Sequence, residues 1–272
     1  MMKIIKPIDD RRLVEELADL WRGRGILAVL VMRDVAIRYR QAAIGIVWAL
    51  LQPIVTTIIF TLVFVVFIRV PSQDVPYPVF AFAGLVIWQY FNRAVSEGAL
   101  SLVTNSGLIT KVYFPRTVMP LVAPVSATLD CLLGVAALLA ITAFFGADVR
   151  WTACFVPLVV LFVGLFSYGL GLCLAPLHAL YRDIGLVLPF ALQIAMYLSP
   201  IAYPANVVPE SVRWLYRLNP IAVMVDAMRW ALVGSEPPSR AGLVFTLALT
   251  ALLFWGGLNI FRRLEGTLVD RI

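Results

Sequence analysis

The 272-residue chain has little charge. Only 14% of its residues are Asp, Glu, Lys or Arg, while 61% are hydrophobic, and its mean hydropathy is +0.91. A soluble domain of this length needs a charged surface, which this composition cannot supply. The sequence therefore predicts a membrane protein that crosses the bilayer several times. The calculated pI is 9.5, but the basic residues flank apolar spans, so we expect no nucleic-acid partner.

The sequence also lacks the motifs of several kinds of active site. It has no GxxxxGK[ST] phosphate-binding loop, no HExxH zinc motif and no GxSxG nucleophile motif. His178 is its single histidine, and Cys131, Cys154 and Cys173 lie in apolar runs without CxxC spacing. We interpret the cysteines as packing residues. We expect no catalytic residue, metal or cofactor in this chain, so energy for any transport must come from a partner or an ion gradient.

Six apolar stretches are long enough to cross the hydrocarbon core, which takes about 20 helical residues. They are residues 44–68, 79–103, 117–145, 153–177, 184–203 and 241–261. Most of the 22 Lys and Arg residues lie in segments that are cytoplasmic if the N-terminus is inside, so both termini are predicted to be cytoplasmic. Charged residues precede the first apolar run, which is unlike a cleavable signal peptide.

The expected fold class is an all-α polytopic membrane protein with one transmembrane domain, residues 44–261. A cytoplasmic segment, residues 1–43, precedes it, and a cytoplasmic tail, residues 262–272, follows it. Residues 204–240 mix apolar and charged residues, and their apolar run 220–234 is too short to cross the membrane. We interpret them as a re-entrant helical pair on the outer side; the alternative is an external loop on the membrane surface.

A short basic helix, residues 26–42, leads almost directly into the first span. Arg33 and Arg40 are seven residues apart and share one face, and Asp34 and Arg38 have the favourable acid-first spacing. Such a helix is expected to lie in the inner membrane interface. Its arginines either anchor the protein or meet anionic headgroups or a phosphate-bearing lipid substrate.

Charged residues within the predicted spans are candidates for a functional role, because charge at membrane depth is costly. Arg93 and Glu97 lie one helical turn apart in the second span, and Asp130 lies in the third. They either form an ion pair that joins the two spans or line a polar conduit. Pro53 in the first span predicts a kink, from packing or from the shape of a gate.

The loop between the second and third spans has room for about two helical turns between Gly107 and Pro115. Its apolar residues are unusual for a cytoplasmic turn, and they predict a docking surface for another protein. The segment predicted to dock comprises Gly107, Leu108, Ile109, Lys111, Val112, Tyr113 and Phe114.

Several segments, in order along the chain, resemble the membrane subunit of type-2 ABC exporters. They are RDVAIRYRQAAIGIVWALLQPI, PYPVFAFAGLVIWQYF, NSGLITKVYFPR, LSPIAYP and LNP. The resemblance extends over about residues 26–262 and fits best the branch that exports O-antigen polysaccharides and teichoic acids. It implies two copies of this chain paired with two copies of a separate ATP-binding cassette subunit, which would bind ATP and Mg²⁺.

The same resemblance implies roles for particular segments. Residues 107–114 would be a coupling helix in the ATPase, and residues 204–232 would be outer gate helices around Leu218, Asn219 and Pro220. The substrate would be a polysaccharide on undecaprenyl diphosphate, exported across the bacterial inner membrane. Arg33, Arg38 and Arg40 would meet the diphosphate or headgroups. Candidate channel aromatics are Trp48, Phe60, Phe64, Phe91, Tyr197 and Tyr203.

Other functions remain open from the sequence. A related exporter could carry capsule glycan, teichoic acid, a drug or a small lipid. A membrane-bound glycan-lipid transferase would need clustered carboxylates or histidines at one membrane face, and none is seen in the sequence. An ion-coupled transporter would need inverted repeats, and none is evident.

Overall fold

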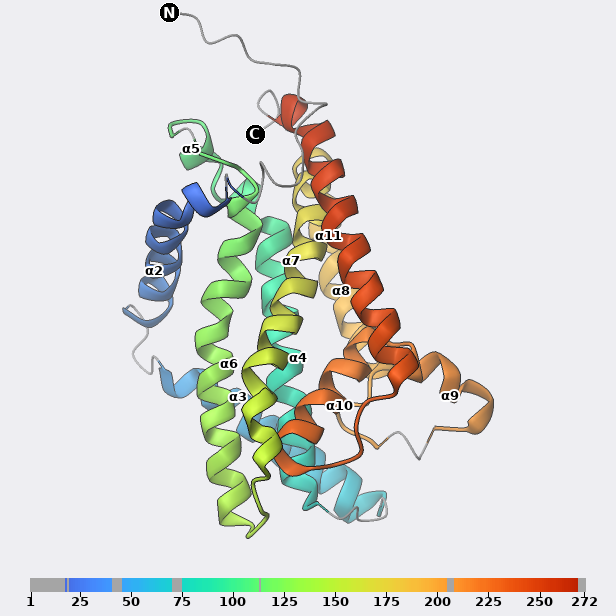
Figure 1. Cartoon of the computed structure of the whole chain (residues 1–272). Coiled ribbons are helices and arrows are strands. Elements are labelled where there is room, and N and C mark those ends of the chain that lie inside the picture. Colours follow the sequence, from blue (N-terminus) through green and yellow to red (C-terminus); the bar gives the residue numbers. More distant parts are fainter. Residues whose placement is uncertain are drawn as a thin grey trace, which may run out of the picture.

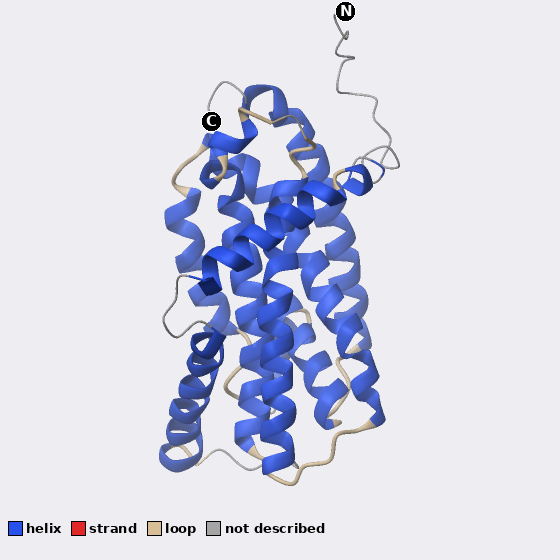
Figure 2. Ribbon diagram, turned by 90° about the vertical axis from the view of Figure 1, so that its left-hand side faces the viewer, coloured by secondary structure: helices blue, strands red, loops and turns tan. Residues whose placement is uncertain are grey.

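The computed structural model describes residues 18, 20–40, 46–69, 75–112, 114–204 and 208–268, and all regular elements within these ranges are helices (Figures 1 and 2). They are, in chain order, α2 (Arg24–Arg40), α3 (Ile46–Thr61), the π-helix η2 (Leu62–Phe67), α4 (Tyr77–Thr104), α5 (Ser106–Ile109), α6 (Val118–Phe144), the 3₁₀-helix η3 (Trp151–Phe155), α7 (Val156–Leu180), α8 (Ile184–Leu198), α9 (Glu210–Arg217), α10 (Pro220–Val233) and α11 (Arg240–Leu268).

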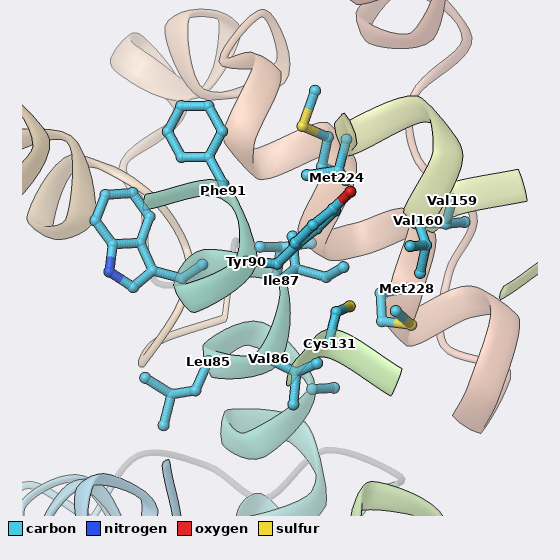
Figure 3. Close-up of a cluster of buried hydrophobic side chains, with 14 of the residues drawn as sticks. Leu85, Val86, Ile87, Tyr90, Phe91, Cys131, Val159, Val160, Met224 and Met228 are labelled. Atoms are coloured by element: carbon cyan, nitrogen blue, oxygen red, sulfur yellow. The ribbon is translucent and has the colours of Figure 1, made fainter. Parts of the chain in front are cut away.

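Helix α4 is the most enclosed helix of the bundle. It packs mainly against α6 and α7, with further contacts to α3, α8 and α10. Val79, Phe82 and Ala94 of α4 are completely buried. Figure 3 shows part of the resulting core, in which Ile87 and Tyr90 lie near Cys131 of α6 and near methionines of α10. The core of the protein is therefore built around α4.

Four of the described helices are long and apolar enough to cross a membrane. They are Leu50–Phe67, Val118–Phe144, Trp151–Leu180 and Arg240–Leu264, which coincide with the predicted first, third, fourth and sixth spans. Helix α4 stands at the second predicted span but is too polar to count among the four, and the fifth, Ile184–Leu198, is apolar but shorter. The all-helical class and membrane character are confirmed, and the count of six crossings stays a prediction.

The fifth predicted span, residues 184–203, is longer than the helix found there. Helix α8 ends at Leu198, and Ser199 has an extended backbone with ψ of 150°. Pro200 accounts for this ending, because proline disfavours a helical conformation in the residue before it and donates no backbone hydrogen bond. The chain from Leu198, the last residue of α8, to Pro204, hereafter the 198–204 segment, therefore turns away from the helix.

The first span carries Pro53 within a continuous helix, and the kink predicted there stays a prediction. Pro53 lies inside α3, where the Thr57 hydroxyl donates to its carbonyl at 2.8 Å, and Thr61 donates to the Thr57 carbonyl at 2.7 Å. Hydroxyl groups bonded back in this way tend to bend a helix. The span then continues as the π-helix η2, a wide turn that often marks functional positions.

The two ends of the bundle are distinguished by their loops. Figure 1 shows α5 at the upper end, where the last turns of α11 also lie, and the connection from α6 to η3 at the lower end. We call these the α5 end and the opposite end. Helix α4 runs between them, because α5 follows its last residue almost directly and α10 packs near its first turns.

Helix α11 packs closely on α7 through small residues. A Cβ atom at Gly257 would lie 2.8 Å from Leu172 Cβ and 3.1 Å from Cys173 Sγ, whereas a Cβ at the adjacent Gly256 would have no neighbour within 4 Å. Close helix approach at glycine is a common way to join helices in membranes.

The two adjacent glycines allow a matched test of this packing. We expect Gly257→Ala to destabilise the protein by about 1–3 kcal/mol, because the added methyl group overpacks the α7–α11 contact. Gly256→Ala should be neutral or slightly stabilising, since alanine favours helix. Thermal unfolding in detergent measures both, and equal melting temperatures for the two variants would contradict the packing.

Candidate functional site

Charged side chains of α2, α4 and α6 meet in one group, hereafter the charge cluster. Its members are Asp34, Arg38, Arg93, Glu97 and Asp130. Arg93 of α4 lies at its centre: Nε donates to Glu97 Oε1 at 3.1 Å, Nη2 lies 3.3 Å from Asp34 Oδ2, and Nη1 contacts Asp130. Arg38 of α2 contacts Glu97 and lies 3.9 Å from Asp130. The cluster thus connects three helices.

The predicted ion pair between the second and third spans is present as Arg93 with Asp130. The side chain of Arg93 is only 12% exposed, so its charge is largely removed from solvent. A mostly buried guanidinium without acceptors would cost several kcal/mol. The three carboxylates of the cluster surround its two guanidinium groups and supply these acceptors.

Helix α2 is attached to the bundle through its polar side. Tyr39 donates to Asp130 of α6, and Arg33 donates to the side-chain oxygen of Asn105 at the end of α4. Leu30, also on this side, is 3% exposed. Figure 1 shows α2 beside the upper half of α6. Helix α2 covers residues 26–40 of the helix expected at 26–42, and residues 41–42 lie outside the described residues; its placement in a membrane interface stays a prediction.

The three arginines of α2 predicted to meet phosphate have different surroundings. Arg38 is half-buried in the charge cluster, where carboxylates already accept its hydrogen bonds. Arg33 and Arg40 are both exposed, as their shared face predicts, although the guanidinium of Arg33 also reaches Asn105 at the end of α4. The apolar Met32 and Ile37 are exposed on the same side, at 70% and 60%. This face therefore combines basic and apolar groups.

Helix α4 has one polar face. Between Phe82 and Ala99, all residues that are partly exposed are polar, and the others are buried. The polar face consists of Gln89, Asn92, Arg93, Ser96 and Glu97. Their amide, hydroxyl and charged groups can donate and accept hydrogen bonds. A face of this kind suits a hydrated or hydroxyl-rich ligand better than an apolar one.

The predicted channel aromatics do not form one group. Phe60 and Phe64 are partly buried and meet edge to face, with ring centroids 6.0 Å apart, and Phe64 stacks on Tyr77 of α4. Phe91 is 4% exposed and packs in the core near Trp88 and Phe166.

Two other aromatics predicted to line the channel are more accessible. Tyr197 is 68% exposed, and Tyr203 is half-buried with its hydroxyl bonded to the Tyr197 carbonyl at 2.9 Å. Trp48 lies in α3, and its side chain is outside the described atoms. The structure thus places Tyr197 on the surface and Phe91 in the core, and the channel role of each stays a prediction.

The segment predicted to dock has an inward side and an outward side. Phe114 is 6% exposed and packs with Leu102 and Met119, and Leu108 and Ile109 lie against the same apolar cluster. The outward side consists of Gly107, Lys111 and Val112, of which Val112 is 46% exposed. Tyr113 lies outside the described residues. Some of the apolar residues on which the docking prediction rested, Leu108, Ile109 and Phe114, therefore pack inside the protein.

The predicted gate region contains two helices, α9 and α10, joined at Leu218-Asn219-Pro220. Asn219 caps α10 by accepting from the Ile221 amide at 2.9 Å, and Pro220 takes the first helical position, where it needs no donor. The Asn219 amide group donates to Ser199 Oγ at 3.0 Å. The two motifs LSPIAYP and LNP are therefore in direct contact.

Arg229 of α10 is the main residue that sequence reasoning missed. It is 2% exposed, and its guanidinium donates to the carbonyls of Phe80, Pro200 and Ile201. The sequence held one sign of this role: Arg229 lies within the mainly apolar run IAVMVDAMRWALV. A charged side chain in such a run needs hydrogen-bonding or charged partners.

Neutralising Asp130 tests whether the charge cluster stabilises the fold. We expect Asp130→Asn to lower the free energy of unfolding by about 1–2 kcal/mol, because Arg93 loses a charged acceptor in a partly buried site. Thermal unfolding in detergent measures the loss, and a double-mutant cycle with Arg93→Met isolates the pair.

The matched control for this substitution is Glu210→Gln. Glu210 also pairs with an arginine, Arg213, but its side chain is 90% exposed, so little change is expected. If Asp130→Asn and Glu210→Gln had the same small effect, the charge cluster would not stabilise the bundle.

Comparison with known proteins places the chain in a family. The family model described as ABC-2 type transporter matches residues 26–233. The chain is 30% identical over 253 residues to the O-antigen export system permease protein RfbA of Myxococcus xanthus, covering 92% of this chain and 95% of that protein. It is 25% identical over 243 residues to the RfbA protein of Klebsiella pneumoniae, covering 88% and 92% of the two chains.

A further relative is the polysialic acid transport protein KpsM of Escherichia coli. The identity is 24% over 242 residues, which cover 87% of this chain and 92% of that protein. The family match includes the charge cluster, the docking segment and both helices of the predicted gate. On these matches, and with the apolar helices described above, the chain belongs to the ABC-2 type transporter family of membrane subunits.

Proposed function

We propose that this chain is the membrane-spanning subunit of an ATP-driven exporter of lipid-linked polysaccharide of the O-antigen type. The observation that carries the proposal is the similarity to the O-antigen export permease of Myxococcus xanthus along nearly the full length of both chains. The polar face of α4 supports it, because a glycan in transit needs hydrogen-bonding partners in place of water.

The energy would come from a separate subunit. The sequence has no phosphate-binding loop, so ATP and Mg²⁺ would be bound by an ATP-binding cassette partner. We propose that this partner contacts the outward side of residues 107–112, where Lys111 and Val112 are exposed at the α5 end. The buried Phe114 would hold that surface in position rather than make the contact.

The glycan would pass between two copies of the chain. Each copy would contribute the polar face of α4 and accessible aromatics such as Tyr197, whose rings can stack on sugars. Phe60, Phe64 and Tyr203 are half-buried candidates for the same path. Arg40 is the first candidate for the lipid diphosphate, because Arg38 is engaged by carboxylates and Arg33, although exposed, donates to Asn105.

The membrane would be the bacterial inner membrane, with both termini in the cytoplasm. This orientation puts the α5 end inside, next to the ATPase, and the α6–η3 connection outside. It agrees with the excess of Lys and Arg in the segments assigned to the cytoplasm. The pair α9–α10 would then lie on the outer side as a re-entrant gate.

Export of a capsule polysaccharide is the second candidate. Its support is the similarity to the polysialic acid transport protein of Escherichia coli, which also covers most of both chains but at lower identity. Both candidates use a polar path and a separate ATPase. They differ in the polymer carried, which chemical analysis can identify.

A gene deletion with complementation tests the proposal. Cells without this chain should lose the polysaccharide from their surface and accumulate its lipid-linked form at the cytoplasmic face, because synthesis continues while export stops. Wild-type chain should restore export. Chemical analysis of the accumulated polymer distinguishes an O-antigen glycan from a capsule. An unchanged surface polysaccharide would contradict the proposal.

Two variants in the same strain test the docking segment. Val112→Asp should abolish export and co-purification of the ATPase, because it places a carboxylate on the proposed contact surface. Val149→Asp is the control: Val149 is equally exposed, at 46%, but lies in the α6–η3 connection at the opposite end. Equal ATPase binding by the two variants would place the contact elsewhere.

A further inference from the structure

Arg229 of α10 holds together parts of the chain that are far apart in sequence. Its Nη1 donates to the Pro200 carbonyl at 2.8 Å, and its Nη2 donates to the Ile201 carbonyl at 2.9 Å. Its Nε donates to the Phe80 carbonyl in the first turn of α4 at 3.2 Å. One side chain thus connects α10, the 198–204 segment and α4.

The surroundings of Arg229 fix its guanidinium in this position. Its carbon Cζ lies 3.4 Å from the centre of the Phe80 ring, and Asp226, one turn earlier in α10, lies 3.7 Å from Nη1. A Cβ atom at Gly84 would lie 2.9 Å from Arg229 Nη2 and 3.0 Å from the Ile201 carbonyl. Glycine at position 84 therefore lets the arginine and the 198–204 segment approach α4.

Two further contacts connect the 198–204 segment to the same helices. The Tyr77 hydroxyl at the start of α4 donates to the Ala202 carbonyl at 2.6 Å. Asn219 at the start of α10 donates to Ser199 Oγ. The carbonyls of three successive residues, Pro200, Ile201 and Ala202, are therefore bound by side chains of α4 and α10.

Helix α4 links this arrangement to the opposite end of the bundle. It has 28 residues, which at 1.5 Å per residue is a length of about 42 Å. Arg229 contacts its first turn, and α5, in the proposed ATPase contact, begins two residues after its last. The charge cluster joins α2 to α4 at Arg93 and Glu97, in the half of α4 that is nearer the α5 end. A displacement of α4 would therefore move the elements attached to it at both of its ends.

We propose that Arg229 is a positioning residue that makes the first turns of α4, the 198–204 segment and α10 move as one unit, so that a displacement started at α5 reaches the α9–α10 pair. The inference rests on the proposed function, since the displacement would come from ATP binding by the partner. Arginine suits this role because its planar group offers several donors in fixed directions, whereas lysine offers a point charge.

The experiment uses the complex of this chain with its ATPase partner in lipid nanodiscs. The native cysteines are replaced, and Ser211→Cys, on the exposed surface of α9, carries a spin label. The distance between the labels of the two copies is measured without nucleotide and with Mg-ATP trapped by vanadate. This readout requires no glycan, so it does not depend on the identity of the substrate.

In the otherwise unaltered complex, trapping should change the label distance. Arg229→Gln should abolish that change while the ATPase stays bound, because displacement of α4 no longer moves the 198–204 segment. Arg217→Gln is the matched control: Arg217 is exposed in the last turn of α9, and its variant should respond fully.

A disulfide separates a tethering role from a merely structural one. Gly84 and Ile201 are adjacent, since a Cβ at position 84 would lie 3.3 Å from Ile201 Cα, and in the Arg229→Gln background the guanidinium that would meet this Cβ is absent. The pair Gly84→Cys and Ile201→Cys, oxidised before labelling, should restore the distance change in the Arg229→Gln background. A bridge that forms without restoring the change would overturn the proposal.

A full distance change in Arg229→Gln without the bridge would overturn the inference and leave the proposed function intact. No change in the unaltered complex, or no complex, would count against both. If Arg229→Gln does not fold, Gly84→Ala replaces it, because its methyl group must displace the guanidinium or the Ile201 carbonyl; a full response in that variant would overturn the inference.

Discussion

Arg93 places a positive charge in the middle of the most enclosed helix of the protein, and this helix together with two neighbouring helices supplies the acceptors that the charge needs. Asp34 comes from α2, Glu97 from α4 itself and Asp130 from α6. Without them, an arginine that is 12% exposed would be costly at membrane depth. The need for these partners explains why a basic N-terminal helix is attached to the bundle.

A second arginine, Arg229, contacts the first turn of α4 and binds a different kind of acceptor. Arg93 binds carboxylates, which could exchange partners, whereas Arg229 binds backbone carbonyls whose positions follow the chain itself. The first arrangement joins α2 and α6 to α4, and the second joins α10 and the 198–204 segment. Helix α4 therefore contacts both the region next to the proposed ATPase and the region of the proposed gate.

Sequence patterns predicted those features of the protein that depend on residues close together in the sequence. The apolar runs matched four helices, and Arg93 met Asp130, which was one of the two arrangements that the sequence left open. Arg229 was missed because its acceptors are carbonyls, which any residue has, and Phe80 is 149 residues away. Likewise, nothing local indicated that Phe114 would be buried.

Because α4 is enclosed by other helices, we expect that it reaches no lipid. A carbene reagent dissolved in the bilayer, with the labelled peptides mapped by mass spectrometry, tests it most directly. We predict labelling of α6, α7 and α11, whose exposed side chains include Leu132, Leu158 and Trp255, and none of residues 79–99. Labelling of residues 79–99 at a level comparable to α6 would contradict the account.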